Sequence, residues 1–365
     1  MSRASYFFMI VTALLFSIGI VMVFNTTSAE VLGDRESAFA HALVMKQMGI
    51  FLIGIIIAAG IYAKGIDWCM QKAPLAFALG VGALLLVFVP KVGMQINGAH
   101  RWINLLGISL QPSEFLKGII PLYFAKSHVQ VKSFKEFCLR QIPFYAAILL
   151  ILVEPDNGTG FILLCTMLVL YFLSRVEWKY WVIASVAFIS AVALLALSHP
   201  HVKSRIDVYL HPEKDLLGKG HQPYQAKIAT GSGGLFGRGL GESVQKLSYL
   251  PEARSDYIAA IYAEEFGFAG IAVMIVLYMG MALSGFVISK GAAIEKHKIV
   301  ALTFTFVIAF QAFLNLAIVS GLLPSKGTNL PFFSQGGSSL WANMMMAACI
   351  FSIHKGRPEW KRQFS

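Results

Sequence analysis

Charged residues are scarce in this sequence: only 13% of its 365 residues are Asp, Glu, Lys or Arg, whereas 57% are hydrophobic. This excludes an ordinary soluble globular domain, in which about a quarter of the residues are charged. Cysteine is scarce too, and the four present, Cys69, Cys138, Cys165 and Cys349, have no disulfide-framework or metal-ligand spacing. The sequence also lacks the phosphate-cradling loop of nucleotide enzymes, a CxxC pair and an HExxH helix. Chemistry driven by ATP or built on a structural metal is therefore excluded.

Long apolar stretches dominate what is present, and the mean hydropathy is +0.67. A helix needs about 20 apolar residues to cross a hydrocarbon core of roughly 30 Å. The sequence therefore predicts an all-α polytopic membrane protein with about ten transmembrane helices, at residues 6–24, 47–63, 73–90, 113–127, 142–154, 158–174, 180–198, 258–289, 299–320 and 337–353. The fifth and sixth stretches are short and separated only by EPDNG, so they could instead form one interrupted helix.

Basic residues in the short loops predict the orientation, because Lys and Arg are retained in the cytoplasm. With a cytoplasmic N-terminus, the inner segments hold about half of the 30 basic residues. The short outer loops then hold only Arg35, Lys46, Lys91, Arg101 and Lys326. This contrast favours ten crossings with both termini in the cytoplasm. The first span follows five residues and precedes no small-residue cleavage site, so it is interpreted as a retained signal anchor.

The chain is predicted to form one membrane domain over residues 1–365, with a long extracytoplasmic loop at about 199–256, between the seventh and eighth spans, and a cytoplasmic tail at 354–365. Eight Lys or Arg of this +11 chain lie in the long loop, where a topology signal would not place them. An anionic partner at the outer face would explain them. The glycines of GSGGLFGRGLGES could bring backbone amides close to a phosphate, or could form a flexible connector.

The segment at residues 97–118 combines a polar, aromatic stretch with the start of a helix. Trp102 is typical of a short amphipathic piece lying in the membrane interface. Ser113 is a suitable helix cap, and Glu114 and Lys117 follow on one helical face. This pair could snorkel to the interface. We favour an orientation into the bundle or a cavity, because exposing charge to lipid costs several kcal/mol.

Residues 321–343 cannot form a continuous helix, because GLLPSKGTNLPFFSQGGSSLWAN contains several prolines and glycines between apolar flanks. Irregular backbone at membrane depth is tolerated where protein covers it or where it lines a watery cavity. This segment is therefore predicted to be a re-entrant or cavity-lining loop.

The stretch LPEARSDYIAAIYAEEFG, residues 250–267, is unusually rich in charge. Asp256 precedes an apolar helix, so it could cap that helix or act on a ligand at its water-facing end. Glu264 and Glu265 lie two to three turns deeper, where an unpaired acid is costly. We expect them to pair with Lys or Arg across the bundle in a structural role.

Six motifs, taken together and in order, resemble the FtsW/RodA, or SEDS, family of bacterial peptidoglycan polymerases. They are GAHRWI, QPSEFLK, EPDNGT, YQ followed by GSGGLFGRGLGES, LPEARSDYIAAIYAEEFGFAG and GLLPSKGTNLPFFSQGGSS. The resemblance covers essentially the whole chain. Two stretches resemble the division-type FtsW more closely than the elongation-type RodA: SKG after GLLP, and QKLSYLPEARSD. Asn157, Arg254 and Gln335 depart from the residues that are common at their positions.

The resemblance implies a GT-C-like glycosyltransferase that polymerises lipid II into β-1,4 glycan strands at the outer face of the inner membrane, in septal wall synthesis or, alternatively, in RodA-type elongation. Asp256 matches the family's catalytic aspartate. Positions of the polar outer cavity are matched by Arg101, Trp102, Glu114, Lys117, Pro155, Asp156, Gln225, Lys246, Glu252, Ser334, Gly336, Gly337 and Ser338. The implied partners are a class B penicillin-binding protein transpeptidase and divisome proteins, without nucleic acid.

The implied reaction needs a base for the attacking sugar hydroxyl and cations for the departing pyrophosphate. Asp256 could be the base, and inversion from an α-linked donor to a β-linked product requires no covalent nucleophile. The candidate cations are Arg101 and Lys117, followed by Lys246 and Arg205. A divalent cation such as Mg²⁺ or Mn²⁺ is left open, because oxygen ligands could come from Asp156, Glu252 and Asp256.

Two other classes of function remain open. A lipid II flippase or transporter would also need interrupted helices and buried charges. Its polar residues would not be expected to concentrate on one side, and no inverted repeat is visible. A scaffold that only recruits a division partner would leave Asp256, Glu114 and Lys117 without a role.

Overall fold

The computed structural model describes residues 2–33, 37–90, 92–96, 99–105, 108–127, 131, 133–197, 218, 220–247, 249–325 and 327–353. In these ranges the chain is mainly helical, with one small sheet. The elements are, in chain order, α1 (Arg3–Gly33), α2 (Ser37–Lys64), α3 (Ile66–Leu86), β1 (Gly93–Ile96), β2 (Ala99–Leu105), β3 (Ile108–Leu110), α4 (Pro112–Ser127), α5 (Phe134–Val153), α6 (Asn157–Leu173), α7 (Trp178–Leu197), α9 (His221–Ser232), α10 (Ile258–Lys290), α11 (Glu295–Val319) and α12 (Gly337–Ser352).

Each of the ten predicted apolar spans corresponds to a helix, α1 to α7 or α10 to α12, which confirms the all-α polytopic architecture. In the described part of the chain, α1, α2, α3, α5, α10 and α11 are long and apolar enough to cross a membrane. The number of crossings stays a prediction. Because α5 ends at Val153 and α6 begins at Asn157, and the two pack together, the alternative of one interrupted helix is wrong.

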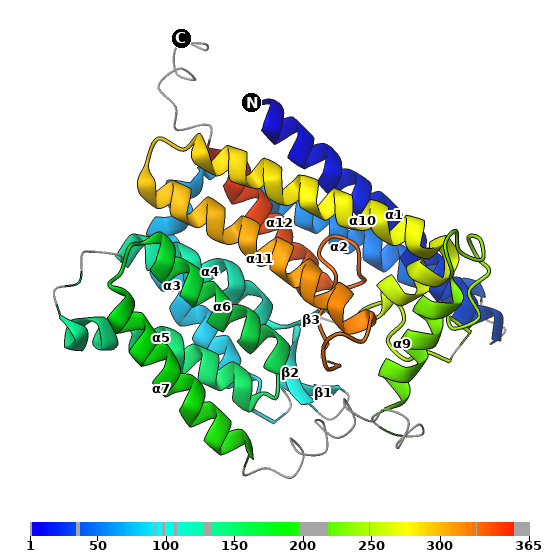
Figure 1. Cartoon of the computed structure of the whole chain (residues 1–365), viewed down its shortest axis with the longest axis horizontal. Helices are drawn as coiled ribbons and strands as arrows, with labels where there is room; N and C mark the ends of the chain where they lie inside the picture. The colour runs from blue at the N-terminus through cyan, green and yellow to red at the C-terminus, as the bar shows by residue number, and fades with distance from the viewer. Residues whose placement is uncertain are drawn as a thin grey trace.

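The helices pack around two hydrophobic clusters. The larger cluster draws mainly on α1, α10, α11 and α12, and the second lies among α3, α4, α5 and α6. Figure 1 shows α1, α10 and α11 along one side of the molecule and α3, α5, α6 and α7 along the other. Helix α4 packs against α3, α11 and α12, and contributes to both clusters. Its first turn is therefore held between the two halves of the bundle.

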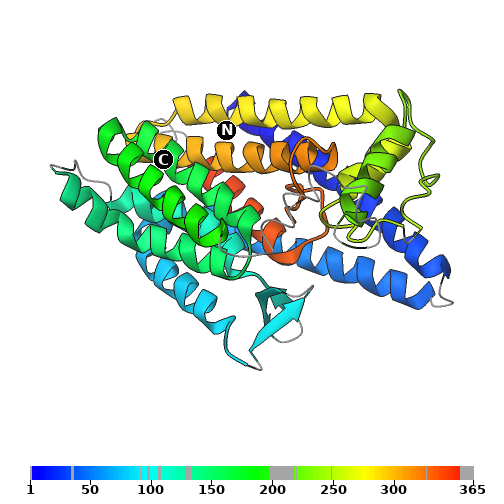
Figure 2. The ribbon, with the colours of Figure 1, turned by 60° about the horizontal axis from the view of Figure 1, so that its bottom comes forward.

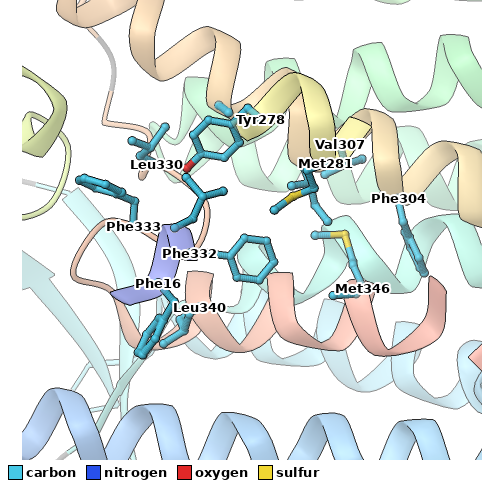
Figure 3. Packing of buried hydrophobic residues seen from close by; sticks show 14 of the residues in the cluster. Phe16, Tyr278, Met281, Phe304, Val307, Leu330, Phe332, Phe333, Leu340 and Met346 are labelled. Atoms are coloured by element: carbon cyan, nitrogen blue, oxygen red, sulfur yellow. The ribbon is translucent and has the colours of Figure 1, made fainter. Parts of the chain in front are cut away.

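The loop between α11 and α12 is buried over much of residues 328–334, as predicted for a segment covered by protein, whereas Leu322 is exposed and the predicted irregular stretch is helical from Gly337 on. Leu330, Phe332 and Phe333 are buried, and the hydroxyl of Tyr278 donates a hydrogen bond to the carbonyl of Pro331 at 2.6 Å. Figure 3 shows these side chains packed with residues of α10 and α12. Burial of the apolar side chains anchors the loop, and so its neighbouring residues 327–329 have a defined position.

Strands β1, β2 and β3 form a small antiparallel sheet in that order, which was not predicted from the sequence. Trp102 pairs with Met94, and Ile103 pairs with Leu110. The predicted amphipathic interfacial piece is thus extended, in keeping with the preference of β-branched and aromatic residues for strands. Figure 2 shows the sheet toward the end of the bundle that also carries α9 and the residue 321–336 loop. The sheet leads directly into α4.

The glycine-rich segment after α9 packs closely against a break in α10. Gly267 has φ of 65° inside α10, and Gly237 has φ of 78°, backbone that favours glycine. The amides of Arg238 and Gly239 donate to the carbonyls of Glu264 and Glu265, each at 3.0 Å. These two amides are therefore not available to a phosphate, and this part of the segment is packed against α10, so the flexible-connector interpretation is wrong for it.

Candidate active site

A cavity of about 80 Å³ lies where β2, α4, α6, α11 and two loops meet, with room for several water molecules. It is lined by Arg101, Trp102, Gln111, Glu114, Lys117, Thr159, Ile162, Asp256, Gln311, Gly327, Thr328 and Asn329. Five residues predicted from the sequence are thereby brought together: Arg101, Trp102, Glu114, Lys117 and Asp256. They come from sequence positions far apart and include both signs of charge.

Asp256 occupies the turn before α10 and directs its carboxylate at the loop between α11 and α12. The N-cap residue of α10 is Tyr257, and Asp256 makes no capping bond, so the capping alternative is wrong. The carboxylate lies against Gly327, where an added Cβ would be 2.7 Å from Oδ2. Within the described ranges no residue donates a hydrogen bond to this carboxylate, which leaves it available to a ligand in the cavity.

The environment of Asp256 raises the pKa of its carboxyl toward neutral pH. Burial and, after it, the negative charge of Glu252 are the main causes that raise the pKa of this carboxyl to about 7. Arg101 opposes the shift, whereas Asp156 and Glu114 add to it. A carboxylate with this pKa can accept a proton near neutral pH more readily than an ordinary aspartate can.

Glu114 and Lys117 form the ion pair predicted from their spacing, with Lys117 Nζ 2.8 Å from Glu114 Oε2. The side chain of Lys117 is 1% exposed, which confirms that the pair points into the bundle. Lys117 also donates to Gln311 Oε1 at 2.7 Å. Its charge is balanced by Glu114, so the pair presents a dipole to the cavity and not a free cation.

Arg101 is held by backbone carbonyls. Its Nε donates to the Glu154 carbonyl at 3.1 Å, and its Nη2 donates to the Pro155 carbonyl. Burial and the charge of Asp156 raise the pKa of the Glu154 carboxyl to about 8, against the opposing effect of Arg101. The raised pKa leaves Glu154 with less negative charge at neutral pH to offset Arg101, although the Asp256 carboxyl also interacts with this cation. Arg101 is therefore the cavity residue best suited to an anion.

Asp156 joins the start of α6 to the start of α4. Its Oδ1 accepts from the amide of Thr159 at 3.2 Å, which caps α6. Its Oδ2 accepts from Gln111 Nε2 and from Ser113 Oγ, each at 2.9 Å. The predicted cap role of Ser113 is wrong, because the residue lies inside α4 and its hydroxyl is donated to Asp156.

Three further predicted residues support the walls of the cavity without lining it. Ser338 Oγ accepts from the amide of Gln111 at 2.9 Å, and Ser334 Oγ accepts from the amide of Leu330 at 2.8 Å. Glu252 is exposed, and its Oε2 accepts from Ser255 Oγ at 2.6 Å. These contacts hold the residue before α4, the loop before α12 and the turn that precedes Asp256.

Lys246 is placed away from the cavity. Its Nζ lies 2.9 Å from Glu265 Oε1 and also donates to Asn25 Oδ1 and to the Gly241 carbonyl, at 2.7 and 2.6 Å. Its ammonium is buried in these contacts. The structure thus groups Lys246 with the charges that fasten the segment after α9 to α1 and α10.

Glu264 and Glu265 have the internal pairing expected of them. Glu264 lies 3.5 Å from Arg238, and Glu265 pairs with Lys246. Their partners come from the segment after α9 and not from across the bundle, because that segment packs alongside the break in α10. Of the remaining predicted residues, Gln225 lies on α9 outside the cavity lining, and Arg205 lies outside the described residues.

The carboxylates considered for a divalent cation do not assemble into a ligand set. In the part of the chain that the structure describes, no group of three His, Cys, Asp or Glu side chains is arranged to hold a metal ion. Both oxygens of Asp156 accept hydrogen bonds from protein groups, and Glu252 accepts one from Ser255. These residues do not fit a metal shared by the three carboxylates.

Sequence reasoning missed several polar residues around the cavity. Gln311 and Asn315 are buried on α11, and Glu154 is buried between α5 and α6. A signal was present, because a polar side chain inside an apolar span usually faces the protein interior. The stretch FQAFLNLAIV places two amides four residues apart, on one helical face.

Comparison with known proteins gives a match over nearly the whole chain. A family model described as cell cycle protein, FTSW_RODA_SPOVE, matches residues 5–359. The chain is 33% identical over 353 residues to stage V sporulation protein E of Bacillus subtilis, covering 95% of each chain. It is 33% identical over 345 residues to the probable peptidoglycan glycosyltransferase FtsW of Aromatoleum aromaticum, covering 92% of this chain and 84% of that one.

Solved structures share the fold. A chain from a peptidoglycan synthase complex, described for its structural coordination of polymerization and crosslinking, matches with a TM-score of 0.77 at 22% identity, covering 96% of this chain and 98% of that one. The rod shape determining protein RodA of Thermus thermophilus matches with a TM-score of 0.69 at 22% identity, covering 96% of each chain. The chain is thus a multi-pass membrane protein of this architecture.

Proposed function

The chain belongs to the FtsW/RodA/SpoVE family, and we propose that it is a peptidoglycan glycosyltransferase that polymerises lipid II into β-1,4 glycan strands. The observation that carries this proposal is the Asp256 carboxylate, which lines the same cavity as Arg101 and accepts no hydrogen bond from the described residues. Relatives that are 33% identical over most of the chain are named probable peptidoglycan glycosyltransferase FtsW, which supports the same reaction class.

In the proposed reaction Asp256 is the general base. It takes the proton from the attacking sugar hydroxyl, whose oxygen forms a bond to the anomeric carbon of the donor sugar. The bond from that carbon to the pyrophosphate oxygen breaks, and its electron pair leaves with the pyrophosphate. The single displacement inverts the anomeric carbon, so no covalent nucleophile is needed. The raised pKa of Asp256, about 7, supports proton transfer at neutral pH.

Arg101 is the proposed contact for the departing pyrophosphate. Backbone carbonyls orient its guanidinium and bring no full negative charge, so its attraction for an anion is retained. The Glu114–Lys117 pair is proposed to orient the sugar hydroxyls through hydrogen bonds, since its net charge is zero. No step is assigned to a metal ion, because the carboxylates do not form a ligand set.

The cellular setting is proposed from the family and from the charge distribution. The protein would lie in the bacterial inner membrane as one domain with both termini cytoplasmic, so that the cavity opens to the outer face. The names of the FtsW relatives favour septal wall synthesis over elongation. A class B penicillin-binding protein is the proposed crosslinking partner, which is consistent with the similarity to a chain of a peptidoglycan synthase complex.

The test is polymerisation of purified lipid II by the detergent-solubilised protein, alone and with its partner transpeptidase. We expect glycan strands from the wild-type chain. Translocation of lipid II across vesicle membranes without any polymer would instead indicate a carrier. Binding of the transpeptidase with neither activity would indicate a scaffold.

A further inference from the structure

Helix α11 buries two amide side chains one turn apart beside the cavity. Gln311 and Asn315 are each 1% exposed. Leaving a buried amide without hydrogen-bond partners is unfavourable, so a buried amide is retained with partners. The groups that these amides contact therefore indicate what they do.

Asn315 connects the two segments that surround the Asp256 carboxylate. Its Nδ2 donates to the Asp256 carbonyl at 2.8 Å and to the Thr328 carbonyl at 2.6 Å. Thr328 follows Gly327, the residue against which the carboxylate lies. One amide group thus fixes both the backbone of Asp256 and the wall that its side chain meets.

Gln311 makes the equivalent connection for Lys117. Its Oε1 accepts from Lys117 Nζ at 2.7 Å, and its Nε2 donates to the Asn329 carbonyl at 2.8 Å. The two amides therefore bind consecutive carbonyls of one loop, those of Thr328 and Asn329. Each side-chain amide also bonds to a charged residue of the cavity: Gln311 to the ammonium of Lys117, and Asn315 to the backbone carbonyl of Asp256.

We propose that Asn315 and Gln311 are positioning residues that set the distance between Asp256 and the Glu114–Lys117 pair. Four residues of helix separate them by about 6 Å, and a packed helix keeps that spacing constant. The inference rests on the proposed glycosyltransferase function. A shift of about 1 Å in a catalytic group can cost about 100-fold in rate, so the spacing matters for turnover more than for binding.

Asn343 provides a matched control. It is also 1% exposed and lies on α12, and its Nδ2 donates to the Ser339 carbonyl of its own helix at 2.8 Å. Asn315 and Asn343 both have an Oδ1 without a hydrogen bond in the structure. Replacing either residue with Leu removes a buried amide, but only Asn315→Leu removes the hydrogen bond to the Asp256 carbonyl.

The experiment compares Asn315→Leu, Gln311→Leu and Asn343→Leu in lipid II polymerisation, with thermal unfolding of each purified protein. We expect kcat of Asn315→Leu to fall about 100-fold with KM nearly unchanged. The apparent pKa of its activity should fall from about 7 toward the ordinary aspartate range, because the carboxyl is no longer held in its buried site. Asn343→Leu should keep kcat and the pH profile of the wild type.

Gln311→Leu should also lower kcat with little effect on KM, but without moving the pH profile, because the contact to Asp256 persists. It provides the test if Asn315→Leu does not fold. Wild-type kcat in a folded Asn315→Leu or Gln311→Leu protein would overturn the inference. So would an equal loss in Asn343→Leu, since that would reflect general destabilisation. Absence of polymer from the wild-type chain would overturn the proposed function itself.

Discussion

The Asp256 carboxylate lies against Gly327, although 70 residues lie between them in the chain. A Cβ at Gly327 would come within 2.7 Å of Asp256 Oδ2, closer than real Cβ contacts occur. Only the absence of a side chain at position 327 lets the carboxylate occupy its place in the cavity.

Gly327→Ala should therefore displace the base. We expect a loss of about 10- to 100-fold in kcat for lipid II polymerisation, because a small misplacement of a catalytic group is costly. Gly49→Ala is the control, since a Cβ there would meet no atom within 4 Å. Equal kcat for both variants would show that the contact with Gly327 does not position the base.

The pH dependence follows from the raised pKa of Asp256. A general base works in its ionised form, so the polymerisation rate should rise with pH through about 7. At one pH unit below the pKa, about a tenth of the molecules would have the ionised base. The pKa of Asp256 is higher in the folded protein than in the unfolded chain, so the folded state favours the protonated carboxyl. The contribution of Asp256 to folding stability is therefore complete below about pH 4 and is lost as the pH rises through about 7.

Glu252→Gln tests the electrostatic part of that shift. The Glu252 carboxylate raises the pKa of Asp256, so its removal should move the rising limb of the rate profile to lower pH. The rate at high pH should stay close to that of the wild type. A profile that does not move, or that moves to higher pH, would contradict the assignment of the limb to Asp256.

Much of the architecture and part of the site could be predicted from the sequence. The ten apolar stretches identified the helices because length and hydropathy are local properties. Spacing alone was enough to pair Glu114 with Lys117. The sheet at 93–110 was missed because it lies next to apolar spans and its pattern is short.

The partners of distant residues could not be predicted. Lys246 reads as a cation of a basic outer loop, but the packing of that loop against α10 brings it to Glu265. Gln311 and Asn315 read as isolated amides within an apolar run, until the fold brings Lys117, Asp256 and the loop carbonyls to them.

Breaking the buried Glu114–Lys117 pair should destabilise the protein strongly. Lys117→Met leaves Glu114 as an uncompensated buried charge, at a cost of about 3–5 kcal/mol. Adding Glu114→Gln should recover part of this loss. Arg140→Met is the control, because the Arg140–Glu136 pair has a similar distance, 2.7 Å, but is solvent-exposed and should contribute less than about 1 kcal/mol.

Thermal unfolding of the purified proteins measures the difference. The midpoint should drop much further for Lys117→Met than for Arg140→Met. Similar drops in the two would mean that burial of the first pair has no energetic consequence.

Gly237→Ala should separate the segment after α9 from α10. Gly237 has φ of 78°, and a Cβ would lie 2.1 Å from the carbonyl oxygen of Glu265. The segment would have to move and release the amides that bind the carbonyls of α10 at its break. We expect faster proteolysis of this segment than in Gly231→Ala, where a Cβ would meet no atom within 4 Å. Equal cleavage rates would contradict the close packing.

The central claim is that Asp256 is the general base of a lipid II polymerase, and Asp256→Asn tests it most directly. The amide has the shape of the carboxylate but cannot accept the proton. Polymerisation of purified lipid II by this variant, folded as judged by thermal unfolding, should fall by about 100-fold or more. Glycan synthesis by Asp256→Asn at the wild-type rate would contradict the account.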